Sequence, residues 1–252
     1  MKRKETNRSA VPLLVAVLFL FVSVKAFGEP GAASQQAIVQ SRGTGKIAGK
    51  VRVDGRLKRP PPLKVYKNRD FCGDTVPNES LLFSPDGGAQ NVVITLTGIR
   101  AGKTETEPKS LVLDNRNCAF VPHVQVAPVG SEILLLNSDP ILHDVHARIG
   151  SETLFNVGLP VWRQVKKRLT RTGVITIECD VLHTWMSAYI LVTSSPYFAV
   201  TDRRGEFVIE GLPAGTYELE AWHEKLGRLL KKVEVMEGRT SGVDFVFCCV
   251  AC

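Results

Sequence analysis

Short runs of aliphatic and β-branched residues recur along this chain, and each run is closed by Gly, Pro, Asn or Asp. Helical periodicity hardly appears after the first 28 residues, whereas short strands and turns at this spacing are typical of β-sandwiches. With 44% hydrophobic and 23% charged residues, the composition is that of an ordinary globular protein. The fold class is therefore predicted to be all-β. The expected strands are KIAGKVRV (46–53), NVVITL (91–96), SLVL (110–113), HVQVA (123–127), EILLLN (132–137), VITIE (174–178), AYILVT (188–193), EFVIEG (206–211), TYELEAW (216–222), LLKKVEV (229–235) and VDFVF (243–247).

The chain changes character at SSPYFAV (194–200), which predicts a domain boundary near Ser195. A first domain is expected over residues 46–195 and a second, smaller β-module over 196–252. In the second module TYELEA (216–221) alternates apolar with polar side chains, so one face of that strand is expected to meet a core. These residues are few for a complete sandwich. As an alternative, residues 46–96 pair with the C-terminal module, and the first domain is then an insertion.

The N-terminus has the pattern of an export signal. Residues 1–8 are basic, residues 11–24 form an apolar run that Lys25 ends, and small residues flank Phe27. A bilayer span needs about 20 apolar residues, so this pattern favours a secretory signal over residues 1–28. An uncleaved membrane anchor is the alternative. Residues 29–45 are small and polar and are expected to form a flexible leader. The mature chain is thus expected to be periplasmic or extracellular, with no membrane span.

The net charge of +7 comes largely from this N-terminal segment. Residues 1–28 carry five cations and one anion, which leaves +3 for the rest of the chain. A nucleic-acid partner therefore loses its main support. The stretch RQVKKRLTR (163–171) holds five cations. A solvated strand face is favoured for it over a surface that steers an acidic redox partner.

Six cysteines can pair if the chain is exported to an oxidising compartment. Cys72 and Cys118 stand alone in turn-like surroundings, and a disulfide between them is predicted because it would staple a loop-rich region. That pairing leaves Cys179 free for chemistry. The role of the C-terminal group, Cys248, Cys249 and Cys252, stays open between soft-metal binding, disulfides and a frayed end.

Two short stretches hold residues suited to metal binding: NSDPILHDVHA (137–147) and CDVLHTWM (179–186). The second offers Cys179, His183 and Met186 in one loop. Thiolate and thioether sulfur favour Cu(I), imidazole accepts either copper oxidation state, and two histidines, a cysteine and a weak axial methionine form a blue-copper site. His143 supplies the missing imidazole if its strand lies beside this loop. Zinc at the same residues is the alternative metal, although thioether is a poor zinc ligand.

Three further residues are expected near this centre. Asp144 and His146 are predicted to act around the ligands, and direct contact of either with the metal stays open; a surface imidazole is a further alternative for His146. Trp185 is expected to shield the site from water while its N–H seeks an acceptor. His123 and His223 are expected to be structural.

At these residues the chain resembles the cupredoxin family. The NxDxxxHxV stretch (Asn137, Asp139, His143, Val145) is similar to the segment that bears the first histidine of plastocyanin-like proteins, and GVITIEC with the Cys, His, Met loop is similar to their second copper segment. The resemblance covers roughly residues 110–247. It implies a Greek-key β-sandwich with one copper ion, type 1 or related, held by His143, Cys179, His183 and Met186. TDRRGEFVIEGLPAGTYELEAW (201–222) resembles the carboxypeptidase-regulatory, or transthyretin-like, module, which implies a second small β-sandwich.

Two positions depart from the plastocyanin pattern. Leu182 lengthens the usual CxxH spacing to CxxxHxxM, which is similar to part of the binuclear copper loop of oxidase subunit II. That loop needs a second cysteine where this chain has Ile175, so a mononuclear centre of blue, red or green character is expected. Asp144 stands where plastocyanins usually have Asn, which could alter the surroundings of the metal.

The function predicted from the sequence is single-electron transfer by an exported copper protein with a protein redox partner, without substrate turnover. Two alternatives belong to other classes: a copper carrier or storage protein using the same ligands, and a metal-free pair of β-sandwiches that recognises carbohydrate or protein.

Overall fold

The computed structural model describes residues 44–55, 58–97 and 107–249, all within one compact unit, Ser41–Cys252. The predicted signal (1–28) and nearly all of the predicted leader (29–45) lie outside the described residues. Within them the protein is all-β, as predicted, and one short helix, α1 (Arg69–Cys72), is present. No helix in this part of the chain has the length and apolarity needed to cross a membrane.

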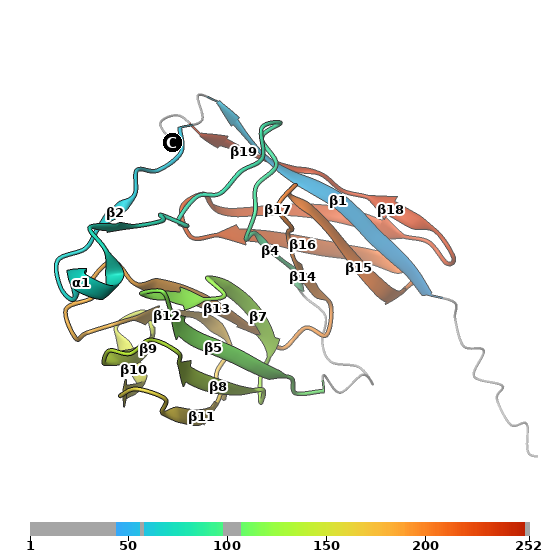
Figure 1. Cartoon of the computed structure of the whole chain (residues 1–252). Helices are drawn as coiled ribbons and strands as arrows, with labels where there is room; N and C mark the ends of the chain where they lie inside the picture. The colour runs from blue at the N-terminus through green and yellow to red at the C-terminus, as the bar shows by residue number, and fades with distance from the viewer. Residues whose placement is uncertain (1–43, 56–57, 98–106, 250–252) are drawn as a thin grey trace, which may run out of the picture. The chain divides into compact units, whose positions relative to one another are not determined.

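The first β-sandwich holds the middle of the chain, coloured green to yellow in Figure 1. One sheet has the order β10-β9-β12-β13-β7 and the other β11-β8-β5-β6. β13–β7 and β5–β8 are parallel pairs, and the other pairs are antiparallel. The strands are β5 (Ser110–Arg116), β6 (Ala119–Val121), β7 (Val124–Pro128), β8 (Glu132–Asn137), β9 (His143–Ile149), β10 (Glu152–Leu159), β11 (Gln164–Arg168), β12 (Gly173–Glu178) and β13 (Ser187–Thr193).

The second β-sandwich joins strands from both ends of the described chain, blue with orange and red in Figure 1. One sheet has the order β15-β1-β18, with β19 also paired to β1, and the other β14-β4-β16-β17. Its strands are β1 (Thr44–Gly55), β4 (Val93–Thr97), β14 (Phe198–Val200), β15 (Glu206–Pro213), β16 (Gly215–His223), β17 (Gly227–Val235), β18 (Thr240–Gly242) and β19 (Phe245–Cys249).

The domain limit at residue 46 needs correction. β1 pairs with β15, β18 and β19, and β4 lies between β14 and β16, so both strands belong to the second sandwich. The insertion considered as an alternative is therefore the arrangement in the structure. Its physical basis is burial: Ile47, Val51, Val53, Ile94 and Leu96 share one apolar core with the C-terminal strands.

Several strands, β10 and β11 among them, were absent from the list of predicted strands. β10 lies at an edge of its sheet and has only one buried residue, so it lacks a clear apolar alternation. β11 holds most of the basic stretch, and its residues alternate between exposed and half-buried. This pattern fits the solvated strand face that the sequence analysis favoured.

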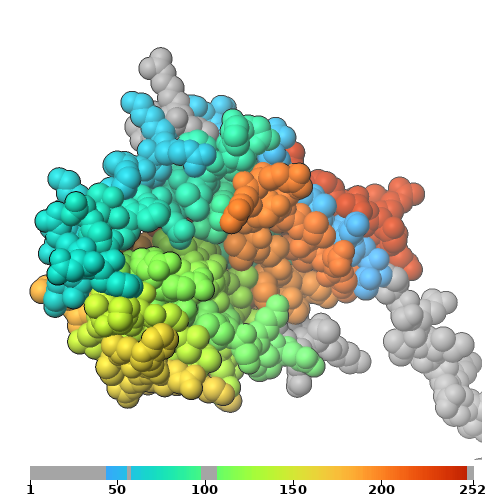
Figure 2. Space-filling view, in the orientation of Figure 1, coloured from blue at the N-terminus to red at the C-terminus, as the bar shows by residue number. Residues whose placement is uncertain are grey.

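The segment between β1 and β4 lies against both sandwiches. It contains β2 (Leu63–Lys64), α1 and β3 (Thr75–Val76). Figure 2 shows its light blue and teal atoms beside the green and yellow residues as well as beside the orange ones. The carbonyl of Gly87 accepts from the N–H of Val53 at 2.9 Å, and Lys67 Nζ donates to the carbonyl of Val181 at 3.3 Å. Cys72 of this segment and Cys118 form the expected disulfide.

Candidate metal centre

The first sandwich brings His143, Cys179 and His183 together. His143 begins β9, Cys179 directly follows β12, and His183 lies in the loop that leads to β13. β9 and β12 are antiparallel neighbours, with Glu178 opposite His146. This pairing carries the imidazole of His143 to the thiol of Cys179 across 36 residues of sequence. One potential ligand atom from each of the three residues lies within 4.8 Å of the others, and all three side chains are buried.

The separations of these atoms fit one small metal ion. His143 Nδ1 and His183 Nδ1 are 3.0 Å apart, and Cys179 Sγ lies 3.9 Å and 3.6 Å from them. A point equidistant from three atoms so separated lies about 2.1 Å from each, inside the triangle they form. Protein metal–nitrogen bonds are about 2.0–2.1 Å and metal–sulfur bonds about 2.3 Å for an ion such as zinc. The three side chains are therefore spaced to bind one metal ion through two imidazole nitrogens and one thiolate sulfur.

The outer nitrogen of each imidazole is held by an acceptor. His143 Nε2 lies 2.9 Å from Asp139 Oδ2, and His183 Nε2 lies 2.8 Å from Asn68 Oδ1. Since these oxygens accept, the ring proton of each neutral histidine is assigned to Nε2. Both Nδ1 lone pairs then face the same space beside the sulfur, with no ring proton between them. A cation between them removes this repulsion, and such outer partners are the usual means of fixing a metal-binding tautomer.

Burial favours the neutral forms of Cys179 and His183 in the metal-free protein. It raises the pKa of the Cys179 thiol to about 12. Burial, followed by the charges of His143 and Lys67, lowers the pKa of His183 to about 4. Burial acts to raise the pKa of Asp139, but hydrogen bonds from His143 and two backbone N–H groups outweigh it and hold that pKa below its usual value. An uncharged imidazole is ready to bind metal, whereas the thiol must release its proton on binding.

Asp144 ties the two metal-binding segments to each other. Its Oδ1 accepts from the N–H of Asp180 at 2.5 Å and of Val181 at 3.3 Å, and its own N–H points at Cys179 Sγ at 3.5 Å. The carboxylate is therefore engaged with the loop backbone. Its position immediately after His143 places it on the opposite face of β9 from the imidazole.

His146 lies away from the three converging atoms. Its Nδ1 is 2.6 Å from Asp180 Oδ2 and its Nε2 is 2.7 Å from Thr153 Oγ1. It shares the face of β9 that carries Asp144, because the two residues are two positions apart in the strand. The side chain thus supports Asp180, the loop residue after Cys179.

Trp185 and Met186, at the end of the loop, turn their side chains into the core of the first sandwich. Trp185 is 8% exposed, and its Nε1–H donates to the carbonyl of Cys118 at 3.0 Å, the acceptor that the sequence analysis expected it to need. Its ring lies 5.1 Å from that of His183, measured between centroids. Met186 is buried in the same apolar core as Cys179 and Trp185, and its N–H donates to the carbonyl of His183 at 2.9 Å. Its predicted part as an axial ligand stays a prediction.

Leu182 accommodates the longer spacing of the loop. Its φ is 69°, in the left-handed region that a branched residue rarely occupies, and its side chain is 63% exposed. The extra residue therefore turns outward while His183 stays inside. The longer spacing between Cys179 and His183 therefore still leaves the His183 side chain buried at the candidate metal centre.

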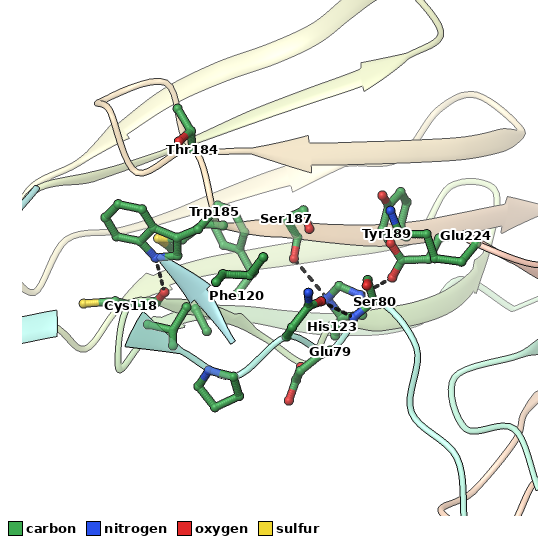
Figure 3. Close-up of a pocket in the computed structure, with 17 residues that line it drawn as sticks. Glu79, Ser80, Cys118, Phe120, His123, Thr184, Trp185, Ser187, Tyr189 and Glu224 are labelled. Atoms are coloured by element: carbon green, nitrogen blue, oxygen red, sulfur yellow. Dashed lines mark hydrogen bonds and ion pairs between the residues drawn. The ribbon is translucent and has the colours of Figure 1, made fainter. Parts of the chain in front are cut away.

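A cavity of about 230 Å³ borders this loop (Figure 3). Trp185 and Met186 line it together with His123 and with Glu224, which follows β16 of the second sandwich. Figure 3 shows His123 between Ser187 and Glu224. The Nδ1–H of His123 donates to the carbonyl of Ser187 at 3.0 Å, and its Nε2 pairs with Glu224.

His223 also has a structural place. Its Nδ1 accepts from the N–H groups of Lys225 and Leu226 at 3.1 and 3.4 Å in the turn after β16. Burial lowers its pKa to about 4. Both histidines outside the metal-binding segments thus hold backbone in place.

Sequence reasoning missed the partner of His183. Asn68 lies 115 positions earlier, in an irregular Pro-rich region without a metal-binding signature. Asp139 belonged to the recognised motif, but its bond to His143 was not anticipated. The spacing of Asp139 and His143, four residues apart on a tight connection, was the one available signal.

Comparisons with known proteins were made for the whole chain. No family model matches it, and no curated protein matches it. Similar solved structures include the copper-containing nitrite reductase of Thermus scotoductus SA-01 (22% identity, TM-score 0.31), a purple cupredoxin of Nitrosopumilus maritimus (20%, 0.30) and a reduced-state amicyanin mutant (18%, 0.30). The alignments cover 38%, 34% and 40% of this chain, and 25%, 99% and 98% of those chains. The chain thus aligns with about a quarter of the nitrite reductase.

Proposed function

We propose that this protein binds one copper ion through His143, Cys179 and His183, with Met186 as a weaker fourth ligand, and transfers single electrons. The observation that carries the proposal is the convergence of one thiol and two tautomer-fixed imidazoles in a buried pocket. A type 1 centre requires this donor set.

The nature of the donors favours copper over zinc. Structural zinc sites usually have four strong ligands, and the methionine thioether is a poor zinc ligand. The cysteine sulfur and the methionine thioether of the same loop instead suit Cu(I), while imidazole suits both copper oxidation states. Copper bound here would supply one-electron redox chemistry between those two states.

The protein's own contribution is rigidity and exclusion of water. His143 starts β9, an interior strand of a five-stranded sheet, and Asp144 holds the cysteine loop against that strand. His143 and His183 are 0% exposed and Cys179 is 3% exposed. Ligands held in this way move little when the charge at the site changes, so the reorganisation that accompanies electron transfer is small.

Three broader assignments belong to the same proposal. The chain is exported, which the Cys72–Cys118 disulfide supports because such bonds persist in oxidising compartments. A protein redox partner exchanges the electron. The second sandwich acts as a carboxypeptidase-regulatory-like packing or docking module, a role supported by the sequence pattern of residues 201–222.

Metal analysis and a visible absorption spectrum of the copper-loaded protein test the copper proposal. We expect one copper per chain and an intense thiolate-to-Cu(II) band that disappears reversibly on reduction. Cys179→Ser should abolish the band because it removes the sulfur. Cys248→Ser is the matched control, since Cys248 is a free, exposed cysteine on β19, and the band should be unchanged.

Other results would point to the alternative functions. A protein that takes up Cu(I), shows little colour and passes the metal quickly to a chelator would be a carrier. Stoichiometric zinc in place of copper would assign a zinc site. The absence of any metal uptake by the folded chain would contradict the proposal and favour a metal-free binding module.

A further inference from the structure

The segment Leu63–Val76, here called the cap, lies outside both sandwiches and contacts the candidate metal centre. β2 and β3 pair at its base, and α1 forms its tip. Figure 1 shows α1 beside the end of the sandwich that contains β9 and β12. Val65 and Val76 are buried in the core of that sandwich, and Leu63 and Cys72 pack against it. The cap is thus packed onto this sandwich although its strands belong to neither of the two sheets.

Asn68 is the cap residue that reaches the centre. It stands at the N-cap position of α1, where an Asn side chain usually accepts a backbone N–H of the first helical turn. Here it makes no such cap bond, and its Oδ1 instead lies 2.8 Å from His183 Nε2. Its φ of 56° is a left-handed conformation that Asn tolerates better than most residues. The side chain is therefore directed to the imidazole rather than to its own helix.

The disulfide joins this contact to the partner of the other histidine. The N–H of Cys72 donates to the carbonyl of Asn68 at 2.9 Å, and Cys72 is bonded to Cys118. The N–H of Cys118 donates at 2.8 Å to Asp139 Oδ2, the same oxygen that holds His143 Nε2. The carbonyl of Cys118 accepts from Trp185 Nε1. One covalent link thus connects the residues that orient both imidazoles.

We infer that Asn68 is a positioning residue for the metal centre, and that the Cys72–Cys118 disulfide keeps it in place by closing the cap over His183. The inference rests on the proposed function only where copper affinity is measured, because the other test uses the metal-free chain. By holding the proton on Nε2, Asn68 keeps Nδ1 of His183 free for the metal. Removal of such a partner typically weakens metal binding about 10- to 100-fold.

The first test uses the metal-free chain. Asn68→Gly removes the acceptor and tolerates the left-handed backbone, whereas Asn68→Asp retains an oxygen at the same place. Nitrogen-15 NMR of the histidine rings should show His183 as the Nε2–H form in the wild type and in Asn68→Asp, and as a tautomer mixture in Asn68→Gly. Asn117→Gly is the matched control: Asn117 is also left-handed, with φ of 55°, and precedes Cys118, but its side chain is exposed.

The second test measures Cu(I) affinity by competition with a chelator. Asn68→Gly should raise the dissociation constant about 10- to 100-fold, Asn68→Asp should restore most of the loss, and Asn117→Gly should leave it within about twofold. A folded Cys72→Ala/Cys118→Ala variant should change in the same direction as Asn68→Gly. If that double variant does not fold, the Asn68 variants decide the inference by themselves.

An unchanged tautomer in Asn68→Gly, or an unchanged affinity despite a tautomer change, would overturn the inference. If the wild-type chain binds no copper, the proposed function fails, but the metal-free NMR comparison still decides whether Asn68 orients His183. The two failures are therefore distinguishable.

Discussion

Two residues of the candidate metal centre, Cys179 and His183, are uncharged in the metal-free protein near neutral pH. The thiol of Cys179 has its pKa raised to about 12 by burial, and the imidazole of His183 has its pKa lowered to about 4, again chiefly by burial. Near neutral pH the metal-free pocket therefore holds no net charge from these two groups. Charge arrives with the metal, and the thiol proton leaves. Buried ligands without charge avoid the large cost of an unpaired ion inside the protein.

Leu182 is a residue whose backbone conformation opposes stability. A branched L-residue in the left-handed region costs about 1–2 kcal/mol, and Gly at the same place does not have this strain. Gly also makes the unfolded chain more flexible, which offsets about 0.5–1 kcal/mol of the gain. Because the Leu182 side chain is mostly exposed, little burial is lost. We expect Leu182→Gly to raise the free energy of unfolding of the metal-free protein by about 0.5–1 kcal/mol, measured by urea denaturation.

Val208→Gly provides the control for this substitution. Val208 is a half-exposed strand residue of β15 with an ordinary φ, so Gly there should lower the free energy of unfolding by about 1 kcal/mol. Equal losses in both variants would show that the left-handed turn at Leu182 carries no strain.

The elements of the second sandwich approach one another closely at the turn before β15. Gly205 has φ of 75°, its N–H donates to the carbonyl of Asp202 at 3.0 Å, and a Cβ at this position would overlap the carbonyl oxygen of Val51 on β1. The turn therefore places β15 directly against β1. Gly211 shares the φ of 75°, but a Cβ there would meet nothing within 4 Å.

Comparing the two glycines separates the cost of a left-handed backbone from the cost of a steric clash with β1. Gly211→Ala should lower the free energy of unfolding by about 1 kcal/mol, the cost of a left-handed Ala. Gly205→Ala should lower it by roughly 2–4 kcal/mol, because overpacking against β1 adds to that cost. Thermal or urea unfolding of both variants measures the difference. Equal effects would mean that β1 can shift without loss.

At the scale of the whole described unit, the two sandwiches meet through a small apolar cluster and one buried pair. Val93 and Trp222 of the second sandwich pack with Val124 and Leu191 of the first. Next to them the imidazole of His123 pairs with Glu224, and both side chains are less than 10% exposed. His123 in turn holds the carbonyl of Ser187, the residue after Met186. The second sandwich is thus connected to the loop of the candidate metal centre.

Glu224 should therefore matter to the stability of the whole unit. Glu224→Ala leaves the buried imidazole of His123 without its partner, and we expect the free energy of unfolding to fall by about 3 kcal/mol. Glu224→Gln should cost much less, since its amide can donate to Nε2 of a neutral imidazole. Glu220→Ala, which removes the partner of a largely exposed Arg228, is the control and should cost at most about 1 kcal/mol. Similar losses in all three variants would refute the role of the pair.

The sequence by itself determined the features that depend on neighbouring residues. Alternation within short runs identified most strands, because the side chains of a strand point to opposite faces in turn. Cys179, His183 and Met186 lie within one short loop, so their chemistry was visible as a group. Strands with mostly exposed or half-buried side chains, such as β10 and β11, lacked this signal and were missed.

Only the tertiary structure decided which distant segments meet. β1 had a clear strand pattern, but its partners lie some 160 residues or more away and were chosen by a shared buried core. The contact of Asn68 with His183 likewise depends on the path of the cap and on the disulfide that holds it. A hydrogen bond between residues 115 positions apart leaves no periodic trace, because its energy depends on where the chain returns in space rather than on the residues beside it.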